Sequence, residues 1–535
     1  MLSENKYFRD LTEAELWQRY CGFLDLSIDE FIDIQEELLM DQIDRVADSV
    51  LGKKIMGKRK PKSVEEFRRM VPLTTYDDYE PYLSEKRENV LAVKPHMWCH
   101  SAGTGGCFKW VPHSSEFLEQ VTKRCLASLI LATCRGRKGW VNFWPGSRFL
   151  LIIPPIPYAS ACMFQALAER FSFKAMPPQE AVQSKDFRER IRRGFQMALR
   201  DGVDIMGGIG SVIVRIGEEM GGQARGMKFS PAMLDPRIVA RMLRALIRSK
   251  REKRGILPKD MWSPKAIMAG GVDTAIYRDD VEHYWGTKPY EFYICTEVFF
   301  LAVESWNRRG MVFVPDSAFL EFIPCGEQAG HHTREKRQVS TVLLDEVEEG
   351  KYYEVVITQF YGLPLLRYRM EDIVKVITLR DDETGIKLPY ITVQGRVGET
   401  INIAGLAELD EKTVWQAIAN TGVKYVDWVA CKEYDQKQTS LRIYLELKEK
   451  KEAGKLATMI DKELKVIDTD YKDIKAYLKL QPVRVSLLSA GTFQRYTEEK
   501  AKEGADLAHL KPRHMNASEE NIQRLLALSA LGSEK

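Results

Sequence analysis

Short β-like runs alternate with helical runs along much of this chain, and that alternation limits its fold more than any other feature. Phe149–Ile153 is predicted to form a buried strand, and Ala161–Phe171 the helix that follows it. A second strand is predicted at Gly202–Met206, and the helix that follows it at Ser211–Met220. Because strand–helix–strand units set their strands in parallel, the pattern predicts an α/β fold with mixed, largely parallel sheets flanked by helices.

The chain of 535 residues is too long for one hydrophobic core, so we expect at least two domains. Helical periodicity over Leu11–Tyr20 and Ile28–Leu51 predicts a helical N-terminal extension. After Gly395 the pattern changes to strands and helices, in the order Glu411–Asn420, Tyr425–Cys431, Leu441–Leu447, Glu452–Val466 and Val483–Leu488. We therefore predict a large N-terminal domain over residues 1–395 and a small, mobile α+β C-terminal domain over residues 396–535.

Charge and cysteine usage exclude several classes of protein. The 79 basic residues nearly balance the 76 acidic ones, which gives no general attraction to nucleic acid. The nine cysteines include no Cys-x-x-Cys pair, which argues against a zinc site and against a disulfide framework. No signal-like segment is visible, and prolines interrupt the longest apolar run, Phe149–Phe164. We expect a cytoplasmic protein with no nucleic-acid or membrane partner.

One helix, predicted over Arg237–Arg254, is strongly basic. No aromatic residues interleave with its charges, which disfavours base stacking. Its apolar residues fall at helical spacing, and we expect them to dock the helix on the protein; they are Ile238, Met242, Leu243, Leu246 and Ile247.

The run Ser101–Lys109 combines glycines, hydroxyl groups and one lysine. Glycines allow a backbone to approach charged oxygens, and successive N–H groups form a nest for an anion. The run lacks the Gly-Lys-Ser/Thr ending of a P-loop, and Gly207–Gly210 lacks the dinucleotide spacing. The run predicts a phosphate loop of another class, although a simple turn explains the glycines as well.

Further polar signals follow in order along the chain. Each of them has a structural explanation when taken alone, such as a strand end or a surface ion pair. They are Ala269–Gly271, Tyr293–Glu297, Leu366–Asp372, Gly395–Gly405 and Gly504–Arg513.

Together these motifs resemble the acyl-adenylate-forming, luciferase-like superfamily, and within it the auxin-responsive family of acyl acid amido synthetases. The 101–109 run is similar to the superfamily's Ser-Ser-Gly-Thr-Thr-Gly-x-Pro-Lys loop, and Tyr293–Glu297 to its Tyr-x-x-Thr/Ser-Glu element. Tyr368–Asp372 is similar to Tyr-Arg-x-Gly-Asp, and Gly395–Gly405 to the hinge between the two domains. The likeness spans nearly the whole chain.

The resemblance implies a role for each matching residue. The triphosphate would lie on Ser101, Gly103, Thr104, Gly105, Gly106 and Lys109, with Gly270, Gly271 and Tyr293 beside adenine. Asp372 and Arg396 would bind the ribose, Thr296 would face the α-phosphate or the substrate carboxylate, and Glu297 would hold Mg²⁺. Lys511 would enter the cleft during adenylation, and Gly398 would serve as the hinge. Tyr158 and Ser211 are candidates for the acid pocket, although core packing explains them equally well.

The implied activity is ATP-dependent conversion of a carboxylic acid to acyl-AMP, followed by transfer to an amine, an amino acid in the family-like interpretation. The partners are therefore a small carboxylic acid and an amine acceptor, and the cofactors are ATP and Mg²⁺. An acyl-CoA ligase shares the first step and stays open. A non-catalytic nucleotide- or acyl-adenylate-binding homologue also stays open, because Ala102, Gly105, Phe108 and Glu371 depart from the motifs. The acid, the acceptor and the oligomeric state do not follow from the sequence.

Overall fold

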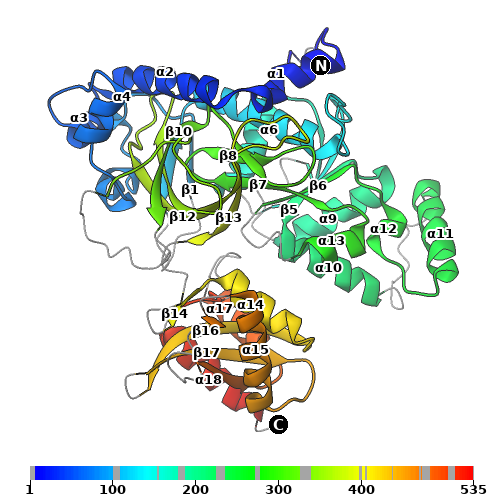
Figure 1. Cartoon of the computed structure of the whole chain (residues 1–535). Coiled ribbons are helices and arrows are strands. Elements are labelled where there is room, and N and C mark those ends of the chain that lie inside the picture. Colours follow the sequence, from blue (N-terminus) through cyan, green and yellow to red (C-terminus); the bar gives the residue numbers. More distant parts are fainter. Residues whose placement is uncertain are drawn as a thin grey trace.

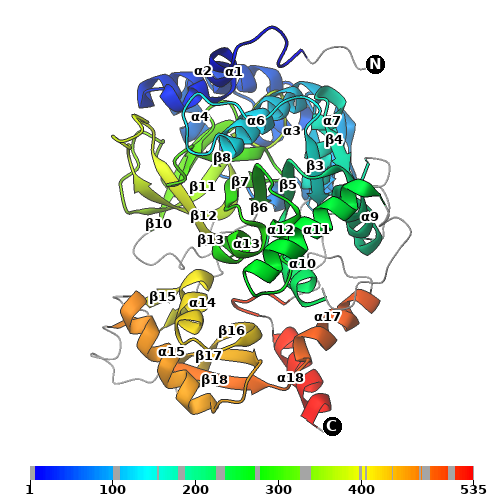
Figure 2. The ribbon, with the colours of Figure 1, turned by 90° about the vertical axis from the view of Figure 1, so that its right-hand side faces the viewer.

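A computed structural model of the chain describes residues 6–100, 109–153, 156–178, 187–223, 235–270, 277–325, 339–396, 401–403, 407–435, 438–468, 471–472, 482–503, 512–517 and 519–533. A large part contains the N-terminal three quarters of the chain, and a smaller part formed by the C-terminal residues lies beside it (Figures 1 and 2). The described N-terminal and C-terminal ends lie at opposite extremes of the molecule in both views.

The helices of the large part lie on both sides of its main sheet. They are α1 (Glu13–Cys21), α2 (Ile28–Val46), α3 (Val50–Met56), α4 (Val64–Met70), α5 (Glu80–Leu83), α6 (Ser115–Thr133), α7 (Ala159–Arg170), α9 (Phe187–Asp201), α10 (Gly210–Gln223), α11 (Pro236–Arg251), α12 (Pro258–Met261) and α13 (Arg278–Trp285), with short 3₁₀ turns at Gly22–Asp25, Tyr76–Asp78 and Glu88–Val90. Capping boxes start α1 and α2, because Thr12 and Ser27 exchange hydrogen bonds with the glutamates three residues later. Helices α1, α2 and α3 lie within the stretches of predicted helical periodicity, Leu11–Tyr20 and Ile28–Leu51, or directly after them.

The main sheet has eleven strands in the order β10-β11-β12-β13-β9-β8-β7-β6-β5-β3-β4. Their bounds are β3 (Arg148–Ile152), β4 (Lys174–Met176), β5 (Ile205–Ile209), β6 (Ala266–Gly270), β7 (Pro289–Cys295), β8 (Phe299–Glu304), β9 (Met311–Phe313), β10 (Ala318–Cys325), β11 (Tyr352–Gln359), β12 (Tyr368–Thr378) and β13 (Tyr390–Arg396). The mixed α/β class is confirmed. Parallel pairing is confined to the end formed by β4, β3, β5, β6 and β7, and every other pairing is antiparallel.

Alternate residues of the parallel strands enter two separate cores. Phe149 and Leu151 belong to the core on the α6 and α7 side, whereas Leu150 and Ile152 belong to the core beneath α9 and α10. Both faces are therefore buried, as an apolar run in a parallel strand predicts. The prediction for the basic helix was wrong in one respect: Leu243, Leu246 and Ile247 of α11 are 53%, 41% and 66% exposed. Ile238, one of the predicted docking residues, is buried as expected, and Ala245 and Ser249 are buried on the same side of the helix.

The C-terminal part has its own sheet, β16-β17-β18, with cores on both faces. Its elements are β14 (Ile401–Ile403), β15 (Ala407–Leu409), α14 (Glu411–Asn420), β16 (Tyr425–Asp435), β17 (Gln438–Leu447), α15 (Ala453–Ile467), β18 (Val483–Leu488), α17 (Thr492–Lys502) and α18 (Glu519–Ser533). A two-stranded hairpin in the large part, β1 (Met97–His100) with β2 (Trp110–His113), flanks the phosphate-loop motif. The boundary between residues 395 and 396 stays a prediction. In the described part of the chain, no helix combines the length and the apolar character that a bilayer crossing requires.

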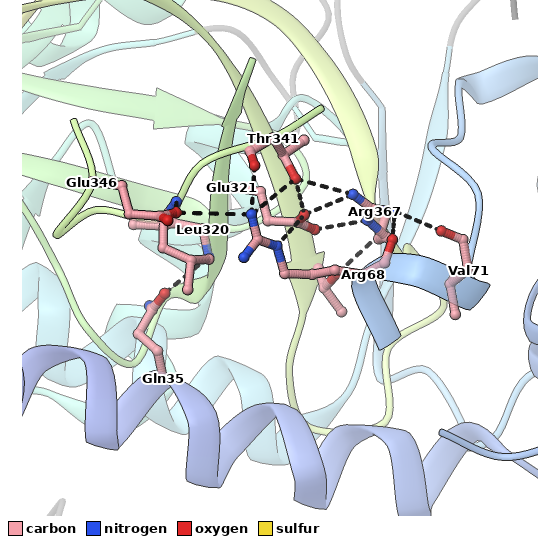
Figure 3. A network of polar contacts seen from close by, with 10 residues as sticks. Gln35, Arg68, Val71, Leu320, Glu321, Thr341, Glu346 and Arg367 are labelled. Atoms are coloured by element: carbon pink, nitrogen blue, oxygen red, sulfur yellow. Dashed lines mark hydrogen bonds and ion pairs between the residues drawn. The ribbon is translucent and has the colours of Figure 1, made fainter. Parts of the chain in front are cut away.

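A buried polar network fixes the beginning of β12 (Figure 3). Arg367 donates two hydrogen bonds to Glu321 of β10, at 2.9 and 2.8 Å, and another to the carbonyl oxygen of Val71. Thr341 also donates to Glu321, at 2.6 Å. Since both charged side chains are almost fully buried, this ion pair sets where β12 begins relative to β10 and α4.

Replacing Arg367 with methionine should lower the free energy of unfolding by about 3 kcal/mol, because the buried Glu321 loses its main partner. The measurement is denaturant unfolding of the full chain. The control is Arg192→Met, which breaks an exposed ion pair with Glu189 and should cost less than about 1 kcal/mol. Equal losses in the two variants would contradict the anchoring role of Arg367.

Candidate active site

A hydrogen bond joins two of the predicted nucleotide-binding residues. The Tyr293 hydroxyl of β7 donates to Oδ2 of Asp372 in β12, over 2.6 Å. Both side chains are buried, with exposed fractions of 5% and 9%. A carboxylate has about four acceptor positions, so this bond leaves Asp372 able to accept from further donors such as ribose hydroxyls.

This contact requires the main sheet to curl. In sheet order β7 and β12 are four strand positions apart, which in a flat sheet is about 19 Å. A separation of 2.6 Å between side-chain atoms therefore means that the antiparallel end folds over toward the end of β7. The curl brings the Tyr293–Glu297 and Tyr368–Asp372 motifs to one place.

A bulge in β12 positions Asp372. Met370, Glu371 and Asp372 stand opposite the single residue Val355 of β11, because the register resumes only at Glu354 and Ile373. Glu371 lies in the left-handed region at φ 60°, and its side chain is exposed. Such bulges bend a strand and redirect a side chain. Here the redirected side chain is the candidate ribose acceptor.

Two more predicted residues lie beside this pair by strand register. Arg396 is the partner of Asp372 in the β12–β13 ladder, and Gly270 at the end of β6 is the partner of Phe292, next to Tyr293. Their backbones thus border the Tyr293–Asp372 contact from both sides.

Thr296 and Glu297 follow β7 directly and are both buried. Gln359 at the end of β11 donates to the carbonyl oxygen of Glu297 over 2.6 Å, which ties this turn to the antiparallel end of the sheet. His113 packs between Phe117 and Phe299 beside Thr296. Burial lowers the pKa of His113 to about 3, against an opposing contribution from the Thr296 backbone, so this imidazole is neutral at physiological pH.

Lys109, the last residue of the phosphate-loop motif, has its ammonium nitrogen 5.8 Å from the centre of the Tyr76 ring. Burial raises the pKa of Tyr76 to about 12, and the charge of Glu297 contributes to this shift. Lys109 thus lies over the Tyr76 ring, and the charge of Glu297 acts on the hydroxyl of the same tyrosine. Sequence reasoning missed Tyr76, Gln359 and His113, because no local motif marks residues that act through tertiary contacts.

Tyr158 lies at the base of the loop hairpin. Its ring contacts His100, the residue before Ser101, with 4.5 Å between ring centres. Within the described residues the Tyr158 hydroxyl is buried and has no hydrogen-bond partner. The tyrosine predicted for the acid pocket therefore contacts the last described residue before the predicted triphosphate loop.

Several predicted residues lie outside the described part of the chain. They are Ser101, Gly103, Thr104, Gly105, Gly106, Gly271, Gly398 and Lys511, together with the departures Ala102 and Phe108. For Arg396 and Ser211 only the backbone is described.

The chain that follows Lys511 is firmly held. Both ring nitrogens of His514 form hydrogen bonds with carboxylates. Nδ1 lies 2.5 Å from Oε1 of Glu411, and Nε2 lies 2.8 Å from Oδ1 of Asp427. His514 also stacks its imidazole ring on Trp428. Its carbonyl oxygen accepts from the Ala430 backbone of β16. The His514 cluster (His514, Glu411, Asp427 and Trp428) thus fixes a point three residues from Lys511 on the C-terminal sheet.

Comparison with known proteins decides the family. Profiles of the GH3 family match its N-terminal domain over residues 22–209, its central domain over residues 311–388 and its C-terminal domain over residues 411–520. Together the three matches cover more than half of the chain. The chain belongs to the GH3 family. The resemblance to the amido synthetase family that the motifs predicted is confirmed.

Curated GH3 relatives are distant. The chain is 27% identical over 300 residues to a jasmonoyl–L-amino acid synthetase, GH3.5, of Oryza sativa subsp. japonica, a match over 51% of this chain and 49% of that protein. A putative indole-3-acetic acid-amido synthetase, GH3.10, of the same organism is 23% identical over 376 residues, covering 64% and 74% of the two chains. The chain thus matches about half the length of the first relative.

Two solved structures share the fold of this chain. The GH3 acyl acid amido synthetase AtGH3.15 in complex with 2,4-DB has a TM-score of 0.71 at 17% identity, over 98% of this chain and 97% of that one. A 2-hydroxyisobutyryl-CoA ligase in complex with 2-HIB-AMP has a TM-score of 0.52 at 14% identity, over 98% and 93%. These likenesses establish the fold.

Replacing Glu371 with glycine should stabilise this GH3 protein by about 0.5–1 kcal/mol, because glycine tolerates the left-handed backbone at φ 60°. Glu371→Ala is the matched control: it removes the carboxylate, keeps the Cβ and should change stability by only a few tenths of a kcal/mol. Thermal unfolding measures both. A stabilisation by alanine equal to that by glycine would instead implicate the charge.

The His514 cluster should stabilise the C-terminal part in a pH-dependent way. Burial alone would lower the pKa of His514, but hydrogen bonds and charge from Asp427 and Glu411 outweigh it and raise the pKa to about 10. The protonated form is thus favoured in the fold. Its contribution is fully present below the ordinary histidine pKa of about 6.5 and is lost as pH rises through about 10.

We therefore expect His514→Gln to lower the unfolding midpoint more at about pH 6 than at about pH 10. The corresponding variant of the exposed His283, His283→Gln, controls for loss of a histidine elsewhere. A difference between wild type and His514→Gln that grows toward high pH would contradict this assignment.

Proposed function

We propose that this GH3 protein activates a carboxylic acid with ATP and transfers the acyl group to the amine of an amino acid. The observation that carries the proposal is the Tyr293–Asp372 hydrogen bond, since it joins an adenine-side and a ribose-side residue beside Glu297. Membership of the GH3 family supports the reaction type. The curated GH3 relatives are described as acid–amino acid synthetases.

In the first step, a substrate carboxylate oxygen attacks the α-phosphorus of ATP, the bond to the bridging oxygen breaks, and pyrophosphate leaves. Two anions must approach each other, so positive charge is the main requirement. Lys109 beside Tyr76 and Lys511 from the C-terminal part would supply it. No general base is needed, because carboxylic acids are ionised at neutral pH.

Glu297 is the residue that would hold Mg²⁺. The donor set fits this ion, because nucleotide-bound Mg²⁺ takes one or two carboxylates and completes its shell with waters and phosphate oxygens. When bound, Mg²⁺ neutralises charge on the phosphate oxygens. Glu297 is buried, and Gln359 holds its backbone through a hydrogen bond to the carbonyl oxygen.

In the second step, the amine attacks the acyl carbon, AMP leaves, and the amine releases a proton. The acyl-adenylate must stay shielded from water until the amine arrives. Rotation of the C-terminal part about the region of Gly398 would withdraw Lys511 and admit the amine. The His514 cluster joins the segment after Lys511 to the C-terminal sheet, and we expect Lys511, three residues before His514, to move with that domain.

A screen with hydroxylamine tests the first step directly. The protein, ATP and Mg²⁺ are incubated with aromatic, fatty or short carboxylic acids, and acyl hydroxamates are measured. We expect hydroxamate with at least one class of acid. Parallel reactions of that acid with mixed amino acids or with CoA separate the amido synthetase from the acyl-CoA ligase. If no acid supports hydroxamate formation or pyrophosphate exchange, the non-catalytic alternative holds.

Replacing Lys511 with alanine should reduce acid-dependent pyrophosphate exchange by at least about 100-fold, while ATP affinity changes less than about threefold, because the lysine acts mainly on transition-state charge. Lys502→Ala, which removes an exposed lysine from α17, is the control and should retain exchange. Parallel losses of ATP affinity and exchange in Lys511→Ala would show that the lysine is misassigned.

A further inference from the structure

A cavity lies at the opposite ends of the parallel strands from the candidate active site. Gly270 and Thr296 mark the carboxyl ends of β6 and β7, where ligands of open α/β sheets bind. Arg148 and Lys174 begin β3 and β4, and Asp201 ends α9 just before β5. Because these strands are parallel, the three residues lie at the amino-terminal edge of the sheet. The cavity there has a volume of about 630 Å³.

The lining of this cavity is strongly cationic. Six basic side chains face one carboxylate, Asp201; they are Arg148, Lys174, Arg200, Arg237, Arg241 and Arg244. Asp201 is already engaged by Lys174 at 2.7 Å and by Arg200 at 3.0 Å, and hydrogen bonds from Arg200, then Lys174, lower its pKa to about 2. The nearby Asp204 is occupied by both arms of Arg148. Because these two carboxylates are outnumbered by the six basic side chains, the cavity carries an excess of positive charge.

Two arginines of α11 carry most of this excess. Arg241 donates to the carbonyl oxygens of Leu199 and Met261, at 3.0 and 2.8 Å, and Arg244 donates to that of Ala240. Among the described residues, no carboxylate lies within ion-pair distance of either guanidinium. Burial lowers the pKa of Arg241, and the charges of Arg244 and Arg148 lower it further. Like charges thus converge at Arg241 and Arg244, while Asp201 and Asp204 are engaged by Lys174, Arg200, Arg237 and Arg148.

Gly202 makes this convergence possible. Its backbone is in the left-handed region at φ 84°, and a Cβ at this position would lie 2.9 Å from Arg148 Nη1 and 3.2 Å from Arg241 Nη2. The glycine therefore lets two guanidinium groups from different elements occupy one side of the cavity. Guanidinium groups match phosphate oxygens in pairs, and several together suit a ligand with more than one phosphate.

We propose that this cavity binds a compact anion bearing two or more phosphate groups, at a site separate from that for ATP. A cavity of this volume suits a small molecule. The phosphates could belong to a free metabolite or to a lipid headgroup. The exposed apolar residues Leu243 and Ile247 lie on the same helix, which lies on the outside of the molecule (Figures 1 and 2).

Calorimetric titration with inositol hexakisphosphate tests the site in the full chain. A saturating concentration of AMP blocks the nucleotide site. We expect binding of one equivalent at about 50 mM salt that weakens at about 150 mM. Arg237→Gln with Arg244→Gln should weaken it at least tenfold. Lys250→Gln with Arg251→Gln removes the same charge from the same helix outside the cavity and should weaken it less than threefold.

Vesicles identify the source of the phosphates. Flotation with phosphatidylcholine vesicles containing about 5 mol% phosphatidylinositol 4,5-bisphosphate is compared between wild type and Leu243→Ser with Ile247→Ser. If flotation with the vesicles is abolished in both double variants, Arg237→Gln/Arg244→Gln and Leu243→Ser/Ile247→Ser, the ligand is a lipid headgroup. Binding of the free probe without flotation assigns a soluble ligand. The proposal would be overturned if Arg237→Gln/Arg244→Gln and Lys250→Gln/Arg251→Gln lost affinity for inositol hexakisphosphate equally. It would also be overturned if the wild type bound neither this probe nor the vesicles. Hydroxamate formation without added phosphate ligand should be unchanged in these variants, so this test stands apart from that of the adenylation activity.

Discussion

The hydrogen bond between Tyr293 and Asp372 is the contact on which the candidate site depends. It connects strands that are four positions apart in the sheet, and only a strongly curled sheet permits it. The same curl brings Gln359 to Glu297, so two independent hydrogen bonds hold the end of β7 against the antiparallel strands. A site for a nucleotide needs groups fixed before the ligand arrives, because each group ordered on binding costs affinity.

Strand β12 is held at three successive points so that Asp372 is correctly placed. Arg367 pairs with Glu321, Arg369 forms two hydrogen bonds with Glu354, and the bulge follows at once. Both ion pairs are buried, so their removal is costly even if their net contribution to stability is small. Both ion pairs fix the register of β12 next to Asp372, the candidate ribose acceptor. The side chain of Glu371 is exposed, and this departure from the glycine of the motif places a non-glycine residue in the left-handed region.

Local patterns predicted most of the elements, and tertiary relations account for what they missed. The helix predicted over Glu411–Asn420 has those bounds in the structure, since an aspartate cap and apolar spacing are local signals. The strand predicted at Gly202–Met206 begins at Ile205, because Gly202 takes the left-handed turn before it. Leu243, Leu246 and Ile247 of α11 are exposed although Ile238 is buried, because helical spacing shows which residues share a face and not which face packs on the protein. The antiparallel half of the sheet, and hence the Tyr293–Asp372 contact, depends on pairing between distant strands.

The central claim is that Asp372 accepts hydrogen bonds from the ribose of ATP. The most direct measurement compares the affinities of wild type and Asp372→Asn for ATP and for 2′,3′-dideoxy-ATP. We predict that wild type binds the dideoxy nucleotide at least about tenfold more weakly than ATP, and that Asp372→Asn hardly distinguishes the two. Undiminished discrimination in Asp372→Asn would contradict the account, because the ribose would then be recognised elsewhere.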